Sequence, residues 1–156
     1  MRPGVHRGEF EVGAAELCLR YVDALNAGDL AAIEALFTPD ATVLSPVYGP
    51  MNAHEFHRAF FDDTDRTRPE VRGLFDHANN GQGAALHLSF SWTFADQETV
   101  EFDAVDLFEL SPEGRFRKLT IVYDSQPVRI AWQAFQQRRL ERAAAAIVLG
   151  HGERAA

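Results

Sequence analysis

The sequence predicts an α+β domain in which amphipathic helices come first, an antiparallel sheet follows and a long helix closes the chain. Three observations support this fold class. Apolar residues recur at helical spacing between residues 13 and 62, the period changes to two between residues 70 and 123, and helical spacing returns over residues 129–149. The length of 156 residues favours a single domain with one core. A strongly curved sheet with helices on its concave side could therefore enclose a pocket.

The first two predicted helices follow each other closely. The apolar residues of the first helix, over residues 13–26, follow the i, i+3, i+4, i+7 pattern: Ala14, Leu17, Cys18, Tyr21, Val22 and Leu25. Gly28 favours a left-handed stop, and Asp29 is a suitable cap for the second helix. The inner stripe of that helix consists of Leu30, Ile33, Leu36 and Phe37. We expect Pro39 to end it.

A short strand, a corner and a third helix are expected next. Residues 41–45 are typical of a strand, and Pro46, Gly49 and Pro50 indicate a corner after it. Asn52 is a suitable cap for a helix that runs to about residue 62. The charged segment 62–69 ends in a proline, and we expect it to form a loop.

The remaining strands form an antiparallel meander. Residues 70–78 are a strand candidate, and Asn79-Asn80-Gly81 predicts a hairpin turn. The next strand carries alternating large apolar residues: Leu86, Leu88, Phe90, Trp92 and Phe94. Further strands are expected at residues 99–110 and 115–123. We therefore divide the chain into a loose leader (1–12), one domain (13–128) and a C-terminal helix (129–149) that packs on the same domain, across the pocket mouth, or on a partner subunit.

Composition excludes several functional classes. The net charge of −8 does not provide the clustered basic residues that nucleic-acid binding needs. No apolar run reaches the length of a membrane span, and the first residues lack the apolar stretch of a signal peptide. The single cysteine, Cys18, cannot form an internal disulfide and fits a reducing compartment. We therefore expect a cytoplasmic protein with no membrane or nucleic-acid partner.

Asp106 is the first candidate for chemistry. On its predicted strand it alternates in phase with the apolar residues Val100, Phe102, Ala104 and Phe108. An inward-facing carboxyl group in an apolar environment would favour its neutral form, which can donate a hydrogen bond to a developing oxyanion. The alternative is that Asp106 faces solvent or pairs with an arginine. Tyr21 also points inward, although most inward tyrosines are core residues whose hydroxyl groups have partners.

The stretch RYVDALNAGDLAAIEALFTPDATVLSPVYGP, residues 20–50, resembles the start of bacterial ketosteroid isomerases. It is also similar to the wider NTF2-like superfamily, which includes SnoaL-type polyketide cyclases, and the similarity extends to VDLF at residues 105–108. The resemblance implies a cone-shaped, curved antiparallel sheet with three N-terminal helices enclosing a pocket. It further implies that Tyr21 and a protonated Asp106 act as a pair of hydrogen-bond donors without a cofactor.

The same resemblance indicates where this chain departs from the isomerases. The residue before the proline that ends the first strand is an aspartate base in that family, whereas here it is Ser45. A serine hydroxyl cannot take up a proton at neutral pH without a neighbouring base. By resemblance to SnoaL-type cyclases, Asp124 is the best candidate for a base. Strand parity places Asp124 on the opposite face from Tyr123, so that Asp124 could equally cap a turn.

The residues expected to contact a ligand are mostly aromatic. They are Ser45, Phe60, Leu88, Phe90, Trp92, Phe102, Phe108, Ile121 and Tyr123. The alternative is that these side chains pack into a solid core. His54 and His57 are expected at the surface or at the pocket rim, and their spacing does not make a metal site. No metal or other cofactor is therefore expected.

Three functions are compatible with these patterns. The first is a cofactor-independent isomerase, cyclase or lyase acting on an apolar polycyclic, polyketide or terpenoid-like compound. The second is a binding protein that keeps the pocket without catalysis, as Ser45 suggests. The third is an association domain, because the superfamily often dimerises through its sheet, and a homodimer is expected.

Overall fold

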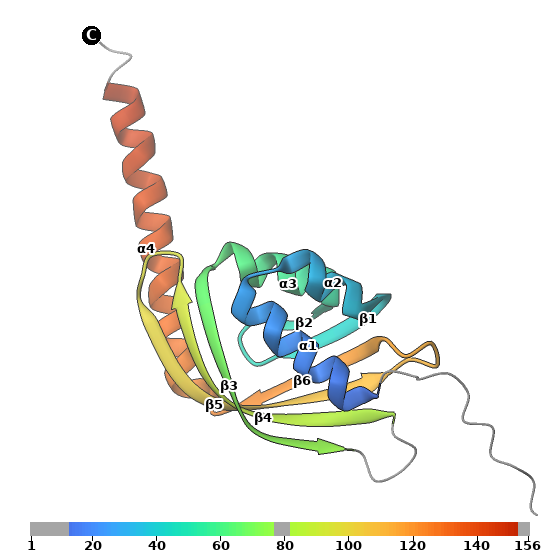
Figure 1. The fold of residues 1–156 in the computed structure, drawn as a ribbon. Helices are drawn as coiled ribbons and strands as arrows, with labels where there is room; N and C mark the ends of the chain where they lie inside the picture. Colours follow the sequence, from blue (N-terminus) through green and yellow to red (C-terminus); the bar gives the residue numbers. More distant parts are fainter. Residues whose placement is uncertain (1–12, 77–81, 153–156) are drawn as a thin grey trace, which may run out of the picture.

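The computed structural model describes residues 13–76 and 82–152, which form one curved sheet, three helices on its concave side and a long C-terminal helix (Figure 1). The elements in chain order are α1 (Ala14–Ala27), α2 (Leu30–Leu36), β1 (Phe37–Ser45), β2 (Gly49–Asn52), α3 (Ala53–Asp62), β3 (Thr64–Asp76), β4 (Gly83–Phe94), β5 (Thr99–Leu110), β6 (Phe116–Tyr123) and α4 (Ser125–Gly152). The α+β class and the cone-like curved sheet predicted from the sequence are confirmed. The expected leader, residues 1–12, and the expected turn at 79–81 lie outside the described residues.

The caps predicted for the N-terminal helices are present. Gly28 ends α1 in the left-handed conformation, with φ of 64°. The Asp29 side chain accepts a hydrogen bond from the Ala32 N–H at 3.0 Å and so caps α2. The Asn52 side chain accepts from the N–H groups of His54 and Glu55 at the start of α3.

The sheet is mixed, which corrects the expectation of a purely antiparallel one. Its strand order is β2-β1-β6-β5-β4-β3, and β1 runs parallel to β6 while the other neighbours are antiparallel. Strand β1 begins at Phe37, so α2 ends before Pro39 and the proline lies within a strand. The corner expected after Ser45 includes the short strand β2, which pairs with β1.

The segment 62–69, expected to be a loop, belongs mostly to β3. This strand begins at Thr64 and pairs with β4 through Pro69, which lies opposite Phe90. Because β3 is at the edge of the sheet, a proline without an N–H group is tolerated there. Charge and proline content thus indicated a solvent-facing edge strand, and a loop was the wrong interpretation.

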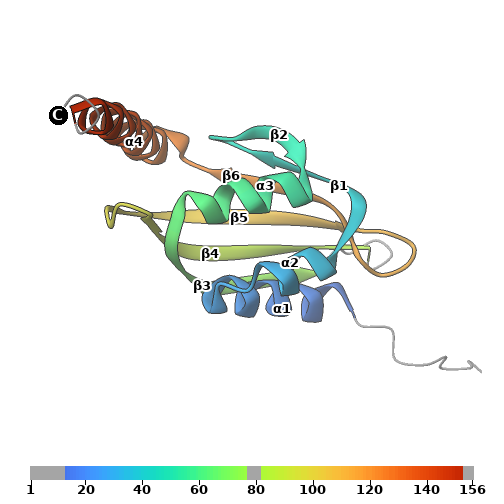
Figure 2. The same cartoon turned by 90° about the horizontal axis from the view of Figure 1, so that it is seen from above.

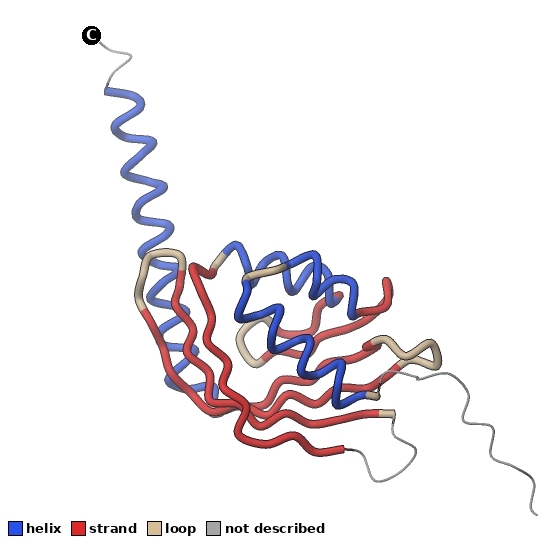
Figure 3. The backbone as a smooth tube through the Cα atoms, in the orientation of Figure 1, coloured by secondary structure: helices blue, strands red, loops and turns tan. Residues whose placement is uncertain are grey.

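Side-chain alternation on the central strands divides the sheet into an inner and an outer face. Leu86, Leu88, Phe90, Trp92 and Phe94 of β4 are all buried, as their period of two predicted. On β5, Asp106 lies on the same inner face as Ala104 and Phe108. Figure 2 shows α1, α2 and α3 lying over this inner face, and Figure 3 shows the same curved layer in red beneath them. The apolar core fills the space between the two layers.

Helix α4 has a packed half and an exposed half. Phe135 is buried and stacks on Phe94 with ring centroids 4.9 Å apart, and Val128 is also buried. By contrast, every residue from 139 to 152 is exposed, and the helix extends away from the sheet (Figure 1). None of the helices in the described ranges combines the length and the apolar character that crossing a membrane requires.

Candidate functional site

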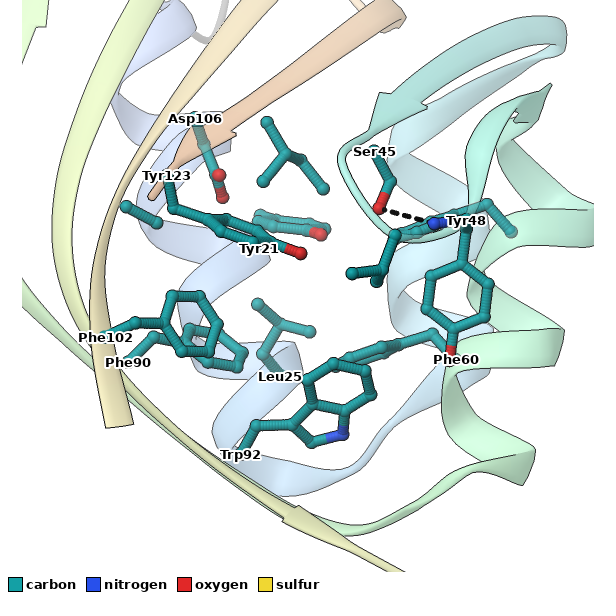
Figure 4. A pocket seen from close by; sticks show the side chains of 14 residues that line it. Tyr21, Leu25, Ser45, Tyr48, Phe60, Phe90, Trp92, Phe102, Asp106 and Tyr123 are labelled. Carbon is teal, nitrogen blue, oxygen red and sulfur yellow. Dashed lines mark hydrogen bonds between the residues drawn. The ribbon is translucent and has the colours of Figure 1, made fainter. Parts of the chain in front are cut away.

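A pocket lies between the inner face of the sheet and the helices α1 and α3 (Figure 4). The centre of a water-sized sphere can occupy about 50 Å³ of it, so that the space is narrow. Most of its lining is aromatic, with one carboxyl group and a few hydroxyl groups. The lining residues are Tyr21, Leu25, Ser45, Val47, Tyr48, Phe56, Phe60, Phe90, Trp92, Phe102, Ala104, Asp106, Ile121 and Tyr123.

The residues expected to contact a ligand lie in this lining, apart from Leu88 and Phe108. Leu88 is fully buried in the core. Phe108 packs against the Tyr21 ring with centroids 5.3 Å apart and against Phe116 at 4.4 Å. The sequence pattern placed both residues on the correct face of the sheet. Both are buried in the core and do not line the pocket.

Asp106 is buried in the pocket wall, with 5% of its surface exposed. It pairs with Leu86 and Ile121 on the neighbouring strands. No hydrogen bond joins its carboxyl group to another residue in the described ranges 13–76 and 82–152. Burial raises the pKa of Asp106 from 3.8 to about 7. In the described residues, Asp106 therefore neither faces solvent nor pairs with an arginine.

Tyr21 reaches the pocket from α1, and its hydroxyl group contacts a histidine. The distance between Tyr21 Oη and His57 Nε2 is 3.0 Å. The other ring nitrogen of His57, Nδ1, lies 2.7 Å from the carbonyl oxygen of Ala53. Burial lowers the pKa of His57 to about 4 and raises that of Tyr21, so both groups are neutral at pH 7.

His57 is only 1% exposed, which corrects the expectation of a surface or rim position. Its ring packs between Phe37 and Phe56, at centroid distances of 5.0 and 4.9 Å. The sequence did contain a signal for this burial. Ala53, Phe56, His57 and Phe60 follow the same i, i+3, i+4, i+7 spacing that identified the inner face of α1, and these four residues are buried in α3.

Ser45 and Tyr123 both line the pocket, and their side chains point toward each other (Figure 4). Ser45 ends β1, and its Oγ accepts a hydrogen bond from the Tyr48 N–H at 3.3 Å. Tyr123 ends β6 and is opposite Ala104, two residues from Asp106 on β5. Burial raises the pKa of Tyr123 to about 12, and the nearby Ser45 hydroxyl acts in the opposite direction. Tyr123 is therefore a neutral phenol beside Asp106.

Tyr48, which the sequence analysis did not single out, connects the pocket to α4. Its hydroxyl group donates to Asp63 Oδ2 at 2.6 Å. Asp63 also forms an ion pair with Arg139 and accepts from Gln136 Nε2 at 3.3 Å, so that two residues of α4 bind the same carboxylate. Helix α4 is thus connected to the pocket through Asp63 and Tyr48. A corner after a short strand carries no periodicity, and Tyr48 could not be assigned a face from sequence.

The structure places Asp124 outside the pocket. The residue is exposed, and its Oδ1 accepts a hydrogen bond from the Gln126 N–H at 3.2 Å in the first turn of α4. Strand β6 ends at Tyr123, which lines the pocket, and Asp124 follows it outside the lining. The structure therefore brings together Tyr21, Asp106, Ser45 and Tyr123, but not Asp124.

Comparison with known proteins assigns a family to this fold. A family model described as a SnoaL-like domain matches residues 19–119, which include both Tyr21 and Asp106. The chain belongs to the SnoaL-like family. A search of curated proteins gave no match for this SnoaL-like protein.

Several solved structures share the fold. The epoxide hydrolase/cyclase-like enzyme SalBIII, described with a role in pyran ring formation in the polyether salinomycin, is 26% identical, with a TM-score of 0.63 over 72% of this chain and 91% of that one. A candidate polyketide cyclase from Pseudomonas putida KT2440 is 22% identical, with a TM-score of 0.63 over 74% and 95% of the two chains. A hypothetical protein from Catenulispora acidiphila with a ketosteroid isomerase-like fold, in complex with trimethylamine, is 12% identical, with a TM-score of 0.62 over 72% and 88%.

The chemical groups of the pocket suit proton transfer better than metal binding. Asp106 is its one carboxyl group, and the remaining polar side-chain groups are the hydroxyls of Ser45, Tyr21, Tyr48 and Tyr123 and the indole N–H of Trp92, which donates to Thr64. Across residues 13–76 and 82–152, no three histidine, cysteine or acidic side chains gather as metal ligands would. The pocket can bind an apolar molecule and present an acid and several phenols to its oxygen atoms.

Proposed function

We propose that this SnoaL-like protein is a cofactor-independent enzyme of the isomerase or cyclase type. Its substrate is an apolar polycyclic, polyketide or terpenoid-like compound that carries a carbonyl or epoxide oxygen. The observation that carries the proposal is the state of Asp106, a buried acid in an aromatic pocket whose pKa of about 7 leaves it partly protonated at neutral pH. A group that titrates near the working pH can both give and take a proton efficiently.

Asp106 can both donate and recover the proton that such a reaction requires, without a second catalytic residue. It gives its proton to the reacting oxygen of the substrate while a new bond forms elsewhere in the same molecule. The substrate then releases a proton from its attacking hydroxyl group or from a carbon atom, and this proton returns to the Asp106 carboxylate. Substrate and product have the same formula, and neither Ser45 nor Asp124 needs to act as a base.

The pocket lining and the family support the substrate class. Phe60, Phe90, Trp92 and Phe102 provide flat apolar walls, which suit rings better than charged or sugar-like molecules. The 26% identical SalBIII is described as an epoxide hydrolase/cyclase-like enzyme, which favours ring closure or epoxide opening among the possible reactions.

The test compares wild-type protein with an Asp106→Asn variant on a panel of hydroxy-epoxides and β,γ-unsaturated cyclic ketones. Chromatography measures the conversion, because substrate and product are isomers of equal mass and mass spectrometry alone does not distinguish them. We expect Asp106→Asn to lower kcat/KM by about 10²- to 10⁴-fold, the usual contribution of general acid–base catalysis. Glu101→Gln, on the exposed outer face of the same strand, is the matched control and should retain full activity.

A second candidate function is a binding protein without turnover. It is favoured by Ser45, which stands where the ketosteroid isomerase resemblance implies a carboxylate base. Binding of panel members to wild-type protein without any conversion would support this candidate. Conversion that Asp106→Asn leaves unchanged would refute the proposed role of Asp106.

A further inference from the structure

The hydrogen-bond partners of His57 fix the direction of the bond to Tyr21. The Ala53 carbonyl oxygen can only accept, so the hydrogen atom in the 2.7 Å contact belongs to His57 Nδ1. A neutral imidazole has one N–H group, and Nε2 is therefore left with a lone pair. Across the 3.0 Å contact, Tyr21 must donate its hydroxyl proton to His57 Nε2.

The proton of Tyr48 is committed in a similar way. Asp63 already accepts from Gln136 and Arg139 and can only accept from the Tyr48 hydroxyl as well. Among the three tyrosines that line the pocket, Tyr21 and Tyr48 thus direct their O–H groups at protein acceptors. Tyr123 differs, because its hydroxyl group lines the same pocket and donates to no acceptor within residues 13–76 and 82–152, which leaves its proton available to a ligand.

We propose that His57 is a positioning residue that makes Tyr21 a hydrogen-bond acceptor for the ligand, while Tyr123 and Asp106 are the donors. The ends of Tyr21 and Tyr123 lie in the same part of the pocket (Figure 4), so one ligand can reach both. The preferred ligand then carries a hydroxyl group that donates to Tyr21 and an oxygen that accepts from Tyr123 or Asp106. This assignment replaces the donor pair of Tyr21 and Asp106 that the isomerase resemblance implied.

His57 acts here by geometry and not by taking up a proton. Burial lowers the pKa of His57 to about 4, so that the imidazole is a poor base at neutral pH. Its ring is held between Phe37 and Phe56, and its Nδ1–H is held by Ala53, which leaves Nε2 aimed at Tyr21. The assignment rests on the proposed function for its role in a reaction, but the binding preference exists with or without turnover.

Two isomeric probes test the preference: 4-ethylphenol, which can donate and accept, and 4-methylanisole, which can only accept. Both dissociation constants are measured by calorimetry or by competition with a fluorescent aromatic dye. Wild-type protein should bind 4-ethylphenol more tightly. Tyr21→Phe should reduce the ratio of the two affinities about fivefold, which corresponds to one hydrogen bond of about 1 kcal/mol.

The variants of His57 separate positioning from packing. His57→Phe frees the Tyr21 O–H group to donate to a ligand, so that binding of 4-methylanisole should tighten while the preference for the phenol shrinks. His57→Gln places a side-chain oxygen near the former Nε2 and should restore the wild-type ratio. Circular dichroism confirms that each variant is folded before the ratio is interpreted.

Two results would overturn the proposal. One is wild-type protein that does not bind 4-ethylphenol more tightly than 4-methylanisole. The other is a His57→Phe variant that changes both affinities by the same factor, which is the result of a purely structural histidine. A protein with the expected probe ratios that converts no substrate would refute the proposed enzyme alone, so the two failures are distinguishable.

Discussion

Asp106 is a single residue whose environment makes the stability of the protein depend on pH. Its pKa is raised from 3.8 to about 7 by burial, so the folded protein binds more protons than the unfolded chain between these values. The free energy of unfolding therefore decreases as the pH rises through this window. The penalty at pH 8 is roughly 4 kcal/mol at most, from about three units at about 1.4 kcal/mol each.

We expect Asp106→Asn to be more stable than wild-type protein at pH 8, by several kcal/mol within that limit. At pH 4 the two proteins should have nearly equal stability, because Asp106 is then protonated in the folded state. Urea denaturation at the two pH values measures the difference. Equal stability at pH 8 would show that Asp106 is hydrated in solution.

The same group should determine the pH dependence of activity. In the proposed reaction Asp106 begins as the protonated acid, so kcat/KM should fall as the pH rises through about 7. The activity of Glu101→Gln should show the same profile. A profile that is flat between pH 5 and 9 would argue against Asp106 as the acid.

His57 has the opposite effect on stability. Its pKa is lowered from 6.5 to about 4, so the unfolded chain binds more protons in this window. Above pH 6.5 the histidine is neutral in both states. As the pH falls from 6.5 towards 4, this group lowers the free energy of unfolding by ~3 kcal/mol. Since Asp106 masks this trend in wild-type protein, it should be measured in Asp106→Asn. Adding His57→Gln should remove most of the slope of unfolding free energy between pH 6.5 and 4.

At the scale of elements, α4 contains one half that stabilises the domain and one that does not. Phe135 is buried and stacks on Phe94, whereas Leu140 is 65% exposed. We expect Phe135→Ala to lower the free energy of unfolding by about 3–5 kcal/mol. Leu140→Ala is the control and should change it by less than about 0.5 kcal/mol. Urea denaturation measures both. A large loss in Leu140→Ala would mean that the exposed half is covered in solution, as pairing with a partner subunit would do.

The elements that sequence predicted well are those with a sustained period. Strand β5 was predicted with its observed bounds, and the inner faces of α1 and β4 were correct. The errors lie where a residue disfavours a strand locally but pairing with neighbouring strands places it in one. Pro39 and Pro69 disfavour regular structure locally, yet each lies in a strand that tertiary pairing stabilises. The parallel pairing of β1 with β6 joins segments that are distant in sequence, and no local pattern reports it.

For the whole molecule, the pocket was predictable to the extent that each strand reports its own inner face. Asp106, Phe90 and Tyr123 were found in this way, and Tyr21 was found from the helical spacing of α1. The contact between Tyr21 and His57 joins α1 to α3 and is set by how the two helices cross, so spacing within either helix does not reveal it. The network around Asp63 depends in the same way on where α4 packs.

The exposed half of α4 offers a practical route for attaching labels. Gly150 lies 15 residues beyond Phe135 in the same helix, roughly 22 Å along its axis, and a side chain added there meets no atom within 4 Å. The native thiol, Cys18, is buried with a pKa raised to about 12 and should not react with maleimides. Gly150→Cys would therefore give one selective tether for a dye or a sensor surface, with the pocket left open to small molecules.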